Sequence, residues 1–263
     1  MPVAGIDIGS LTAEVVLLEG NKILHSTILP TGANSRKAAE KAMNEALESA
    51  GLALSDLEYV IATGYGRISI DFANKRITEI TCHGRGAHYL NRDIRTVIDI
   101  GGQDSKVISL NEKGRALDFT MNDKCAAGTG RFLEVMAQAL EVELEELACI
   151  SAQAKNSVSI SSMCTVFAES EVVSLIAQGL PKEDIAHGLH QSIAERTAGM
   201  VNRVGLLKPV MITGGVAKNA AVVKALEEKL KTEIFVPVEP QIAGALGAAL
   251  LAGEEAGGKT KIY

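Results

Sequence analysis

Two aspartates, each followed two residues later by a glycine, carry the strongest sign of chemistry in the sequence. Asp7 lies in Gly5-Ile-Asp-Ile-Gly-Ser10, and Asp99 lies in Val97-Ile-Asp-Ile-Gly-Gly-Gln-Asp-Ser105. Glycines let backbone N–H groups approach an anion closely, and a carboxylate beside such a turn can hold a hydrated Mg²⁺. Two stretches of this kind, facing one another, would clamp the phosphates of a nucleotide.

These two stretches are copies of an internal repeat. When Asp7 is aligned with Asp99, Gly9 falls on Gly101 and Leu18 falls on Leu110. Each copy is an apolar strand, a glycine turn and a second apolar strand, which predicts a β-hairpin. A lone Asp-x-Gly turn is usually structural, but two copies with matching flanks favour a shared function.

A third element near the C-terminus has a related pattern. The predicted strand 209–213 meets Gly214-Gly215, and a helix begins near Lys218. A strand, a glycine pair and a helix N-terminus together suit a phosphate or a nucleoside. Small residues dominate the last predicted helix, which begins near Gln241, and they indicate close packing against another helix.

The four cysteines divide into two kinds. Cys125 and Cys164 precede predicted helices, and a helix N-terminus stabilises a thiolate or a negatively charged cluster. Cys82 and Cys149 lie in apolar helical contexts, where a free cysteine is usually a small buried hydrophobe. A cubane needs four thiolates, which one chain could supply, or which two chains could supply in pairs across a two-fold axis. A Cys₄ zinc site is the chemical alternative.

Alternating strands and helices position these residues and predict an α/β fold. The pattern predicts three strands over 3–29, a helix over 35–50, a strand at 59–63 and a helix over 79–91. The second copy continues with strands at 97–100, 106–110 and 116–121. After it we expect helices at 131–140, 144–150, 166–177 and 182–204, and a β-rich piece at 158–161.

Composition limits the function classes. The chain has 263 residues, of which 47% are hydrophobic and 22% charged, so it is globular. Its net charge of −6 argues against a nucleic-acid partner. We find no apolar run of transmembrane length and no signal-peptide pattern, and we therefore expect a cytoplasmic protein. In that compartment its cysteines are not expected to form disulfides.

The three glycine elements, in this order, resemble the nucleotide-binding signature of the actin, Hsp70 and sugar-kinase (ASKHA) superfamily. Gly5–Ser10 resembles its first phosphate loop, Asp99–Ser105 its second, and Ile212–Asn219 its adenosine loop. The resemblance implies two ribonuclease-H-like domains with ATP in the interdomain cleft. The first would comprise 1–95 plus 242–263, and the second would comprise 96–241 and carry the cluster cysteines.

A narrower resemblance rests on the run Asn122-Asp-Lys-Cys-Ala-Ala-Gly-Thr-Gly-Arg-Phe-Leu-Glu134 and the later Cys164. It is similar to the activator ATPases (component A) of 2-hydroxyacyl-CoA dehydratases, the benzoyl-CoA reductase ATPase subunits and the double-cubane cluster protein reductases. The resemblance implies a homodimer that shares one [4Fe–4S] cluster, held by Cys125 and Cys164 of each chain. ATP hydrolysis would then drive a low-potential electron into a partner iron–sulfur protein, with ferredoxin or flavodoxin as upstream donor.

Within this reading, Asp7, Asp99 and Gln103 are the candidate catalytic residues. The aspartates would face Mg²⁺ through water, and Gln103 would orient water or sense the γ-phosphate. No other residue of the sequence forms a motif with His83 or His88, and both are interpreted as structural. The residues expected to contact ATP or ADP are Gly9, Ser10, Leu11, Thr12, Gly101, Gly102, Gln103, Asp104, Gly214, Gly215, Ala217, Asn219 and Gln241.

Two other functions remain open on the sequence. One is a small-molecule, sugar-type kinase of the same superfamily, with Asp99 as a candidate base; however, we find no separate sugar-binding motif. The other is a non-catalytic assembly or chaperone-like module that binds ATP but contains no iron. Neither requires a pair of cysteines at helix starts.

Overall fold

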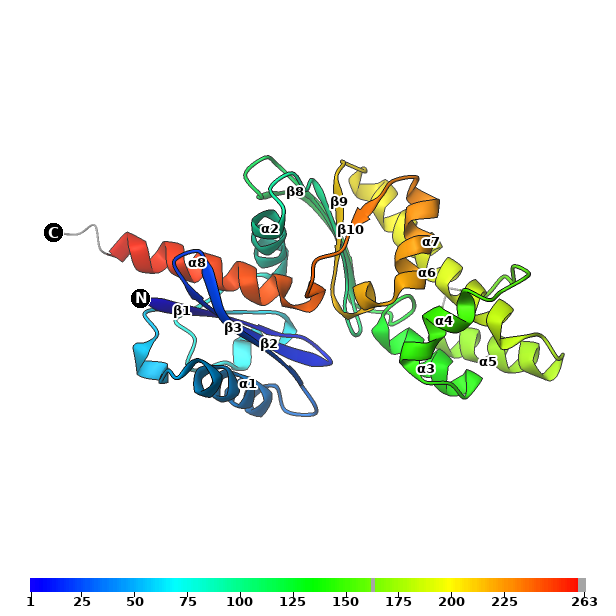
Figure 1. The fold of residues 1–263 in the computed structure, drawn as a ribbon, viewed down its shortest axis with the longest axis horizontal. Helices are drawn as coiled ribbons and strands as arrows, with labels where there is room; N and C mark the ends of the chain where they lie inside the picture. Colours follow the sequence, from blue (N-terminus) through cyan, green and yellow to red (C-terminus); the bar gives the residue numbers. More distant parts are fainter. Residues whose placement is uncertain (162–163, 260–263) are drawn as a thin grey trace. The chain divides into compact units, whose positions relative to one another are not determined.

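The computed structural model describes residues 1–161 and 164–259. The chain forms two compact units, each built on a mixed five-stranded sheet flanked by helices (Figure 1). Unit 1 contains residues 1–95, 110–117 and the segment from 238 onward, and unit 2 contains 96–109 and 118–237. The α/β architecture expected from the sequence is therefore present in both units.

In unit 1 the strand order is β3-β2-β1-β4-β5. Strands β1 and β2 form the antiparallel first hairpin, β3 extends it, and β4 runs parallel to β1. Helix α1 packs on one face of this sheet, and α8 packs on the other together with α2. The bounds are β1 Pro2–Ile8, β2 Thr12–Glu19, β3 Lys22–Pro30, β4 Val60–Thr63, β5 Lys75–Arg76, α1 Ser35–Ala50, α2 Glu79–Leu90 and α8 Ala243–Lys259.

Helix α8 lies unusually close to its neighbours because glycines face it. A Cβ on Gly5 of β1 would lie 2.0 Å from the carbonyl oxygen of Ala245. A Cβ on Gly86 of α2 would lie 1.9 Å from the carbonyl oxygen of Ala243, and one on Gly247 would lie 1.7 Å from that of Cys82. The close packing expected from the small residues of this last helix is thus confirmed, with α2 as the partner helix.

In unit 2 the strand order is β10-β9-β6-β7-β8. Strands β6 and β7 form the antiparallel second hairpin, and β9 runs parallel to β6, which repeats the arrangement of unit 1. The strand bounds are β6 Thr96–Ile100, β7 Ser105–Leu110, β8 Ala116–Asn122, β9 Val210–Thr213 and β10 Ile234–Phe235. The helix bounds are α3 Gly130–Leu140, α4 Leu147–Ser151, α5 Thr165–Ala177, α6 Lys182–Val204 and α7 Ala220–Leu230.

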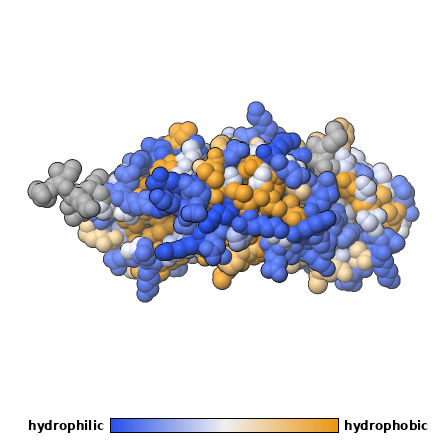
Figure 2. Space-filling model, turned by 90° about the horizontal axis from the view of Figure 1, so that it is seen from above, coloured by the Kyte–Doolittle hydropathy of each residue, from blue (hydrophilic) through white to orange (hydrophobic). Residues whose placement is uncertain are grey.

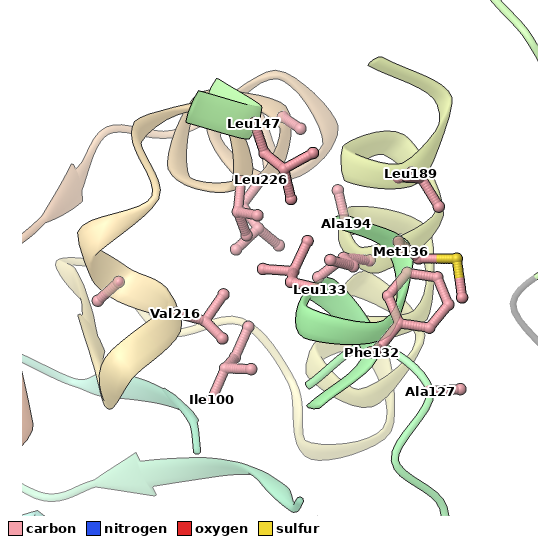
Figure 3. Packing of buried hydrophobic residues seen from close by; sticks show 14 of the residues in the cluster. Ile100, Ala127, Phe132, Leu133, Met136, Leu147, Leu189, Ala194, Val216 and Leu226 are labelled. Atoms are coloured by element: carbon pink, nitrogen blue, oxygen red, sulfur yellow. The ribbon is translucent and has the colours of Figure 1, made fainter. Parts of the chain in front are cut away.

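The core of unit 2 joins the hairpin to the helices. Figure 3 shows Phe132, Leu133 and Met136 of α3 packed with side chains of α6, close to Ile100 at the end of β6 and to Val216. All of these belong to one buried cluster. Helix α3 is therefore seated on the same core that supports the end of the second hairpin.

The predicted β-rich piece at 158–161 is wrong, because this segment pairs with no described strand. Its alternating residues pack on α6 instead. The carbonyl oxygen of Val158 lies 2.3 Å from where a Cβ of Gly188 would stand, and Ile160 is buried in the unit 2 core. Among the described residues, no helix is both long enough and apolar enough to cross a membrane.

Candidate functional site

One candidate site surrounds Asp7 at the end of β1, in unit 1. Asp7 lies opposite Glu14 on β2 and beside Thr63 on β4. Gly64 follows Thr63 with a φ of 82°, and a Cβ there would lie 2.2 Å from Oδ1 of Asp7. Because any side chain at position 64 would meet the carboxylate, glycine is required on this side.

Helices α8 and α2 close the other side of the Asp7 carboxylate. A Cβ on Gly244, in the first turn of α8, would lie 1.9 Å from Oδ2 of Asp7. The Nε2 atom of His83 on α2 lies 3.7 Å from the same oxygen. A helix N-terminus favours a negative charge, so the start of α8 stabilises the ionised aspartate. His83, which we interpreted as structural, is thus a neighbour of a candidate catalytic residue.

The turn of the first hairpin is fixed by Thr31, the residue that follows β3. Gly9 N–H donates to the carbonyl of Thr12 at 2.8 Å. The hydroxyl of Thr31 donates to the carbonyl of Gly9 at 3.0 Å, and its N–H donates to the carbonyl of Leu11 at 2.8 Å. The expected nucleotide contacts over residues 9–12 therefore form one ordered turn next to Asp7.

A second candidate site, in unit 2, surrounds Asp99, whose side chain is held from both neighbouring strands. Asp99 is only 2% exposed. Thr213 on β9 donates its hydroxyl to Oδ1 at 2.8 Å, and Nζ of Lys106 on β7 lies 3.2 Å from Oδ2. The same Nζ lies 2.5 Å from Oδ2 of Asp104. Lys106 is buried, so these two carboxylates share one internal cation.

The glycine turn of the second hairpin is closed by its own backbone and bound to α3. Gly101 N–H donates to the carbonyl of Asp104 at 2.9 Å. The carbonyls of Gly101 and Gly102 accept hydrogen bonds from the N–H groups of Gly130 and Arg131, at 2.9 and 2.8 Å. The candidate phosphate loop therefore caps the N-terminus of α3. Gln103, at the tip, is exposed.

The strand, glycine pair and helix expected as the adenosine loop are present in unit 2. Gly214 follows Thr213 with a φ of 83°, and a Cβ there would lie 2.3 Å from the carbonyl oxygen of Ile100. A short 3-10 turn, Gly215–Lys218, then leads to α7. Ala217 in this turn is buried, so its own side chain offers little surface to a nucleoside.

Asn219, the last residue of that loop, uses its side chain inside unit 2. Its Oδ1 accepts hydrogen bonds from the N–H groups of Ala221 and Val222 at 3.0 and 3.1 Å, which caps α7. Its Nδ2 lies 3.2 Å from Nε2 of His190. Burial, together with the neighbouring His187, lowers the pKa of His190 to about 4. The neutral ring therefore accepts the Asn219 amide proton. Gln241 lies in a short turn of unit 1.

The two proposed ligand cysteines both precede helices of unit 2. Cys164 is the N-cap of α5, whereas Cys125 lies five residues before α3 and packs against the unit 2 core. Only Cys164 is thus directly at a helix start. Both are half-buried. Partial burial suits the predicted cluster, which must be bound by the protein and still be accessible to an electron acceptor.

The other two cysteines fit a cluster poorly. Cys82 is buried, and burial raises the pKa of its thiol to about 12. Cys149 is exposed on α4, so our interpretation of it as a buried hydrophobe is wrong. Within the described residues no group of three or more His, Cys, Asp or Glu side chains could hold a metal ion. Cys125 and Cys164 stay the predicted ligands, and two thiolates are half of the four that a cubane needs.

Several neighbours of the two aspartates were missed by sequence reasoning, although extending the repeat would have found most of them. The alignment of Asp7 with Asp99 places Glu14 on Lys106. The dipeptides Thr63-Gly64 and Thr213-Gly214 also match, and each threonine lies beside its aspartate in the parallel ladder. His83 carries no such signal, because only the packing of α2 brings it to Asp7.

Known proteins are similar to this chain along nearly its whole length. A curated relative, the activator of lactoyl-CoA dehydratase from Anaerotignum propionicum, is 49% identical over 96% of this chain and 97% of its own length. The solved structure of component A of (R)-2-hydroxyglutaryl-CoA dehydratase from Acidaminococcus fermentans has a TM-score of 0.94 and 46% identity, covering 98% of this chain and 99% of that one.

A second solved structure is the activator of 2-hydroxyisocaproyl-CoA dehydratase from Clostridium difficile with bound ADPNP. It has a TM-score of 0.94 and 46% identity, covering 100% of this chain and 98% of that one. A ROK family glucokinase from Streptomyces griseus shares the fold alone, with a TM-score of 0.59 and 15% identity. The model of the BadF/BadG/BcrA/BcrD ATPase family matches residues 4–252, and the chain belongs to that family.

Proposed function

We propose that the chain is an ATP-dependent electron donor. ATP hydrolysis would drive one low-potential electron from a [4Fe–4S] cluster to a partner iron–sulfur protein, such as a 2-hydroxyacyl-CoA dehydratase or a double-cubane cluster protein. The observation that supports this most is the bonding of the first turn of α3 to the carbonyls of Gly101 and Gly102. It joins the candidate nucleotide loop to the segment that carries Cys125.

In this proposal ATP binds through the turns of both hairpins. The turn at residues 9–12 and the turn at Gly101–Asp104 would offer backbone N–H groups to the phosphates, and Asp7 and Asp99 would hold a hydrated Mg²⁺ ion. Mg²⁺, when bound, would neutralise charge on the phosphates. Gln103 is exposed at the tip of its turn, so its amide is able to orient an attacking water.

The cluster would be held by Cys125 and Cys164 together with the same pair from a second copy. A bound [4Fe–4S] cluster supplies a one-electron carrier at low potential. The start of α5 directs its N–H groups toward the Cys164 side, where they favour a thiolate. Cys125 is positioned by the core and by Asn122, whose Nδ2 donates to the carbonyl of Cys125 at 2.7 Å.

A homodimer is supported by the surface next to Cys164. Val166 and Phe167, in the first turn of α5, are 64% and 67% exposed, and Val173 two turns later is also exposed. Large apolar side chains grouped on one helix favour burial against another protein surface. Figure 2 shows that hydrophobic residues reach the surface of the molecule in patches bordered by hydrophilic ones.

The proposed partners follow from the one-electron chemistry. Ferredoxin or flavodoxin, in the cytoplasm, would reduce the donor, and the acceptor would be an iron–sulfur dehydratase or reductase. Two proteins named as activators of dehydratases are 49% and 47% identical to this chain, which supports an acceptor of that class.

The test is anaerobic purification followed by iron, sulfide and visible-absorption measurements. We expect about one cubane per two chains, and a dimer by light scattering. Cys125→Ala and Cys164→Ala should each lose the iron. Cys149→Ala and Cys82→Ala are the matched controls, because one removes an exposed thiol and the other a buried thiol with a raised pKa, and both should keep it.

Two outcomes would contradict the proposal. An iron-free protein that hydrolyses ATP would favour a kinase or an assembly module of the same fold. A Cys149→Ala variant that lost iron while Cys164→Ala kept it would show that the ligands are wrongly assigned.

A further inference from the structure

The N-terminus of α3 is capped in an uncommon way. The first N–H groups of a helix usually bond to a side chain of the N-cap residue. Thr129 is the N-cap of α3 but makes no such bond. The N–H groups of Gly130 and Arg131 bond to the carbonyls of Gly101 and Gly102 instead.

Those two carbonyls determine where the adjoining N–H groups of the glycine turn point. A trans peptide is planar, with its C=O and N–H directed oppositely. Since the carbonyls of Gly101 and Gly102 point to α3, the N–H groups of Gly102 and Gln103 point away from it. Neither N–H donates a hydrogen bond to a described residue. An anion bound by these N–H groups would polarise the very peptide units that hold α3.

The hydroxyl of Thr129 lies between two acceptors. Its Oγ1 is 3.0 Å from the carbonyl oxygen of Gly102 and 2.6 Å from that of Ala126, and the residue is 0% exposed. A hydroxyl has one proton, so it donates fully to only one carbonyl at a time. Ala126 directly follows Cys125, and its carbonyl also accepts the N–H of Thr129 at 3.1 Å. Thr129 thus links the glycine turn to the cysteine loop.

We propose that Thr129 is the positioning residue that transmits nucleotide occupancy to Cys125. A phosphate bound at the Gln103 N–H strengthens the Gly102 carbonyl as an acceptor, because hydrogen bonds in a chain polarise one another. The Thr129 proton then shifts toward Gly102 and leaves the Ala126 carbonyl. This loosens the turn that follows Cys125. The inference rests on the proposed function and adds the residue that regulates it.

The test compares Thr129→Val, which keeps the shape but loses the donor, with Thr129→Ser, which keeps the donor. Hydrogen–deuterium exchange at residues 126–131 is measured with ADP and with ADPNP on the anaerobically purified protein. Iron-chelation rates are measured in the same two states. In the wild type and in Thr129→Ser, the exchange and chelation rates with ADP should differ from those with ADPNP by roughly five-fold or more, which is the lower end of typical coupling. In Thr129→Val the rates with the two nucleotides should be the same, while the affinity for each nucleotide should stay within about three-fold of the wild-type value.

The matched control is Thr165→Val, at the residue after the other cysteine. The Thr165 hydroxyl is buried and has no hydrogen-bond partner among the described residues, so its loss should leave the nucleotide response intact. If Thr129→Val fails to fold, Thr129→Ala removes the same donor with less volume and carries the same expectation.

A Thr129→Val protein with the full wild-type response would overturn the inference, as would a wild type whose exchange at 126–131 ignores the nucleotide. A wild type that lacked iron but still showed nucleotide-dependent exchange, lost in Thr129→Val, would refute the proposed function alone. The exchange measurement therefore separates the two failures.

Discussion

The two hairpins place an aspartate at the same register position but set it opposite different charges. Asp7 lies across the ladder from Glu14, whereas Asp99 lies across from Lys106. The threonine on the parallel neighbour and the positive-φ glycine after it are the same in both units. The two copies of the repeat thus share the same backbone arrangement around the aspartate, but the charge of the cross-strand residue differs.

This difference indicates a division of labour between the two units. Asp99 is oriented by Thr213 and Lys106, and its charge is already balanced inside unit 2. Asp7 is confined by the shapes of Gly64 and Gly244 and lies beside a second carboxylate. We therefore expect the first hairpin to attract a divalent cation more strongly, and the second to hold its loop in a fixed shape.

The largest effect should come from Asp99→Asn. ATP turnover should fall by about 10³-fold, equivalent to ~4 kcal/mol of barrier, because the charge pair of Asp99 with Lys106, which holds the second glycine loop in shape, is lost. Iron content should not change, since the proposed ligands lie elsewhere. Steady-state phosphate release measures the effect, with the exposed Asp93→Asn as control. Unchanged turnover would remove Asp99 from the site.

The stability of the two hairpins should respond unequally to neutralising the cross-strand residue. Lys106→Met leaves the buried Asp99 and the half-buried Asp104 without their shared cation and should lower the free energy of unfolding by about 3 kcal/mol. Glu14→Gln removes a charge of the same sign as Asp7 and should change it by less than ~1 kcal/mol. Denaturant titration of the nucleotide-free protein measures both, and the exposed Lys113→Met serves as control. Equal losses would refute the proposed difference.

Low pH should reduce the free energy of unfolding, because His190 of unit 2 has a lowered pKa in the folded protein. Its pKa is about 4 in the folded protein and 6.5 in an unfolded chain, so the unfolded state binds the extra proton between these values. Stability is therefore full above pH 6.5 and falls as the pH drops toward 4. The loss from pH 7 to pH 4.5 should be about 2 kcal/mol. His190→Gln keeps an acceptor for Asn219 and should flatten this part of the stability profile; an unaltered profile would contradict the assignment.

The smallest expected difference lies between two asparagine caps. Asn219 caps α7 with two hydrogen bonds and also contacts His190, whereas Asn34 caps α1 with a single exposed one. Asn219→Ala should cost about 1.5 kcal/mol and Asn34→Ala about 0.5 kcal/mol. Thermal unfolding of the two variants side by side measures the difference. A larger loss for Asn34→Ala would reverse the ranking.

The sequence predicted those features that are local in the chain. The glycine turns and α6 were found because hairpins and helix ends have short-range signals, such as Pro181 before α6. The segment 158–161 was mispredicted because its apolar alternation serves packing on α6. The exposure of Cys149 and the approach of His83 to Asp7 depend on how helices pack, which spacing alone does not reveal. The nucleotide contacts, the cluster ligands and the domain boundaries remain predictions.

The packing of α8 on β1 also governs how the chain is made. Gly5 contacts the backbone at Ala245, which is translated 240 residues later. At about 5–20 residues per second, the ribosome needs roughly 10–50 s to supply it. All of unit 2 precedes α8 in the chain, so its segments are complete before unit 1 can close. The first strand synthesised is therefore among the last to be covered, and the face of β1 that α8 covers stays bare throughout that interval of translation.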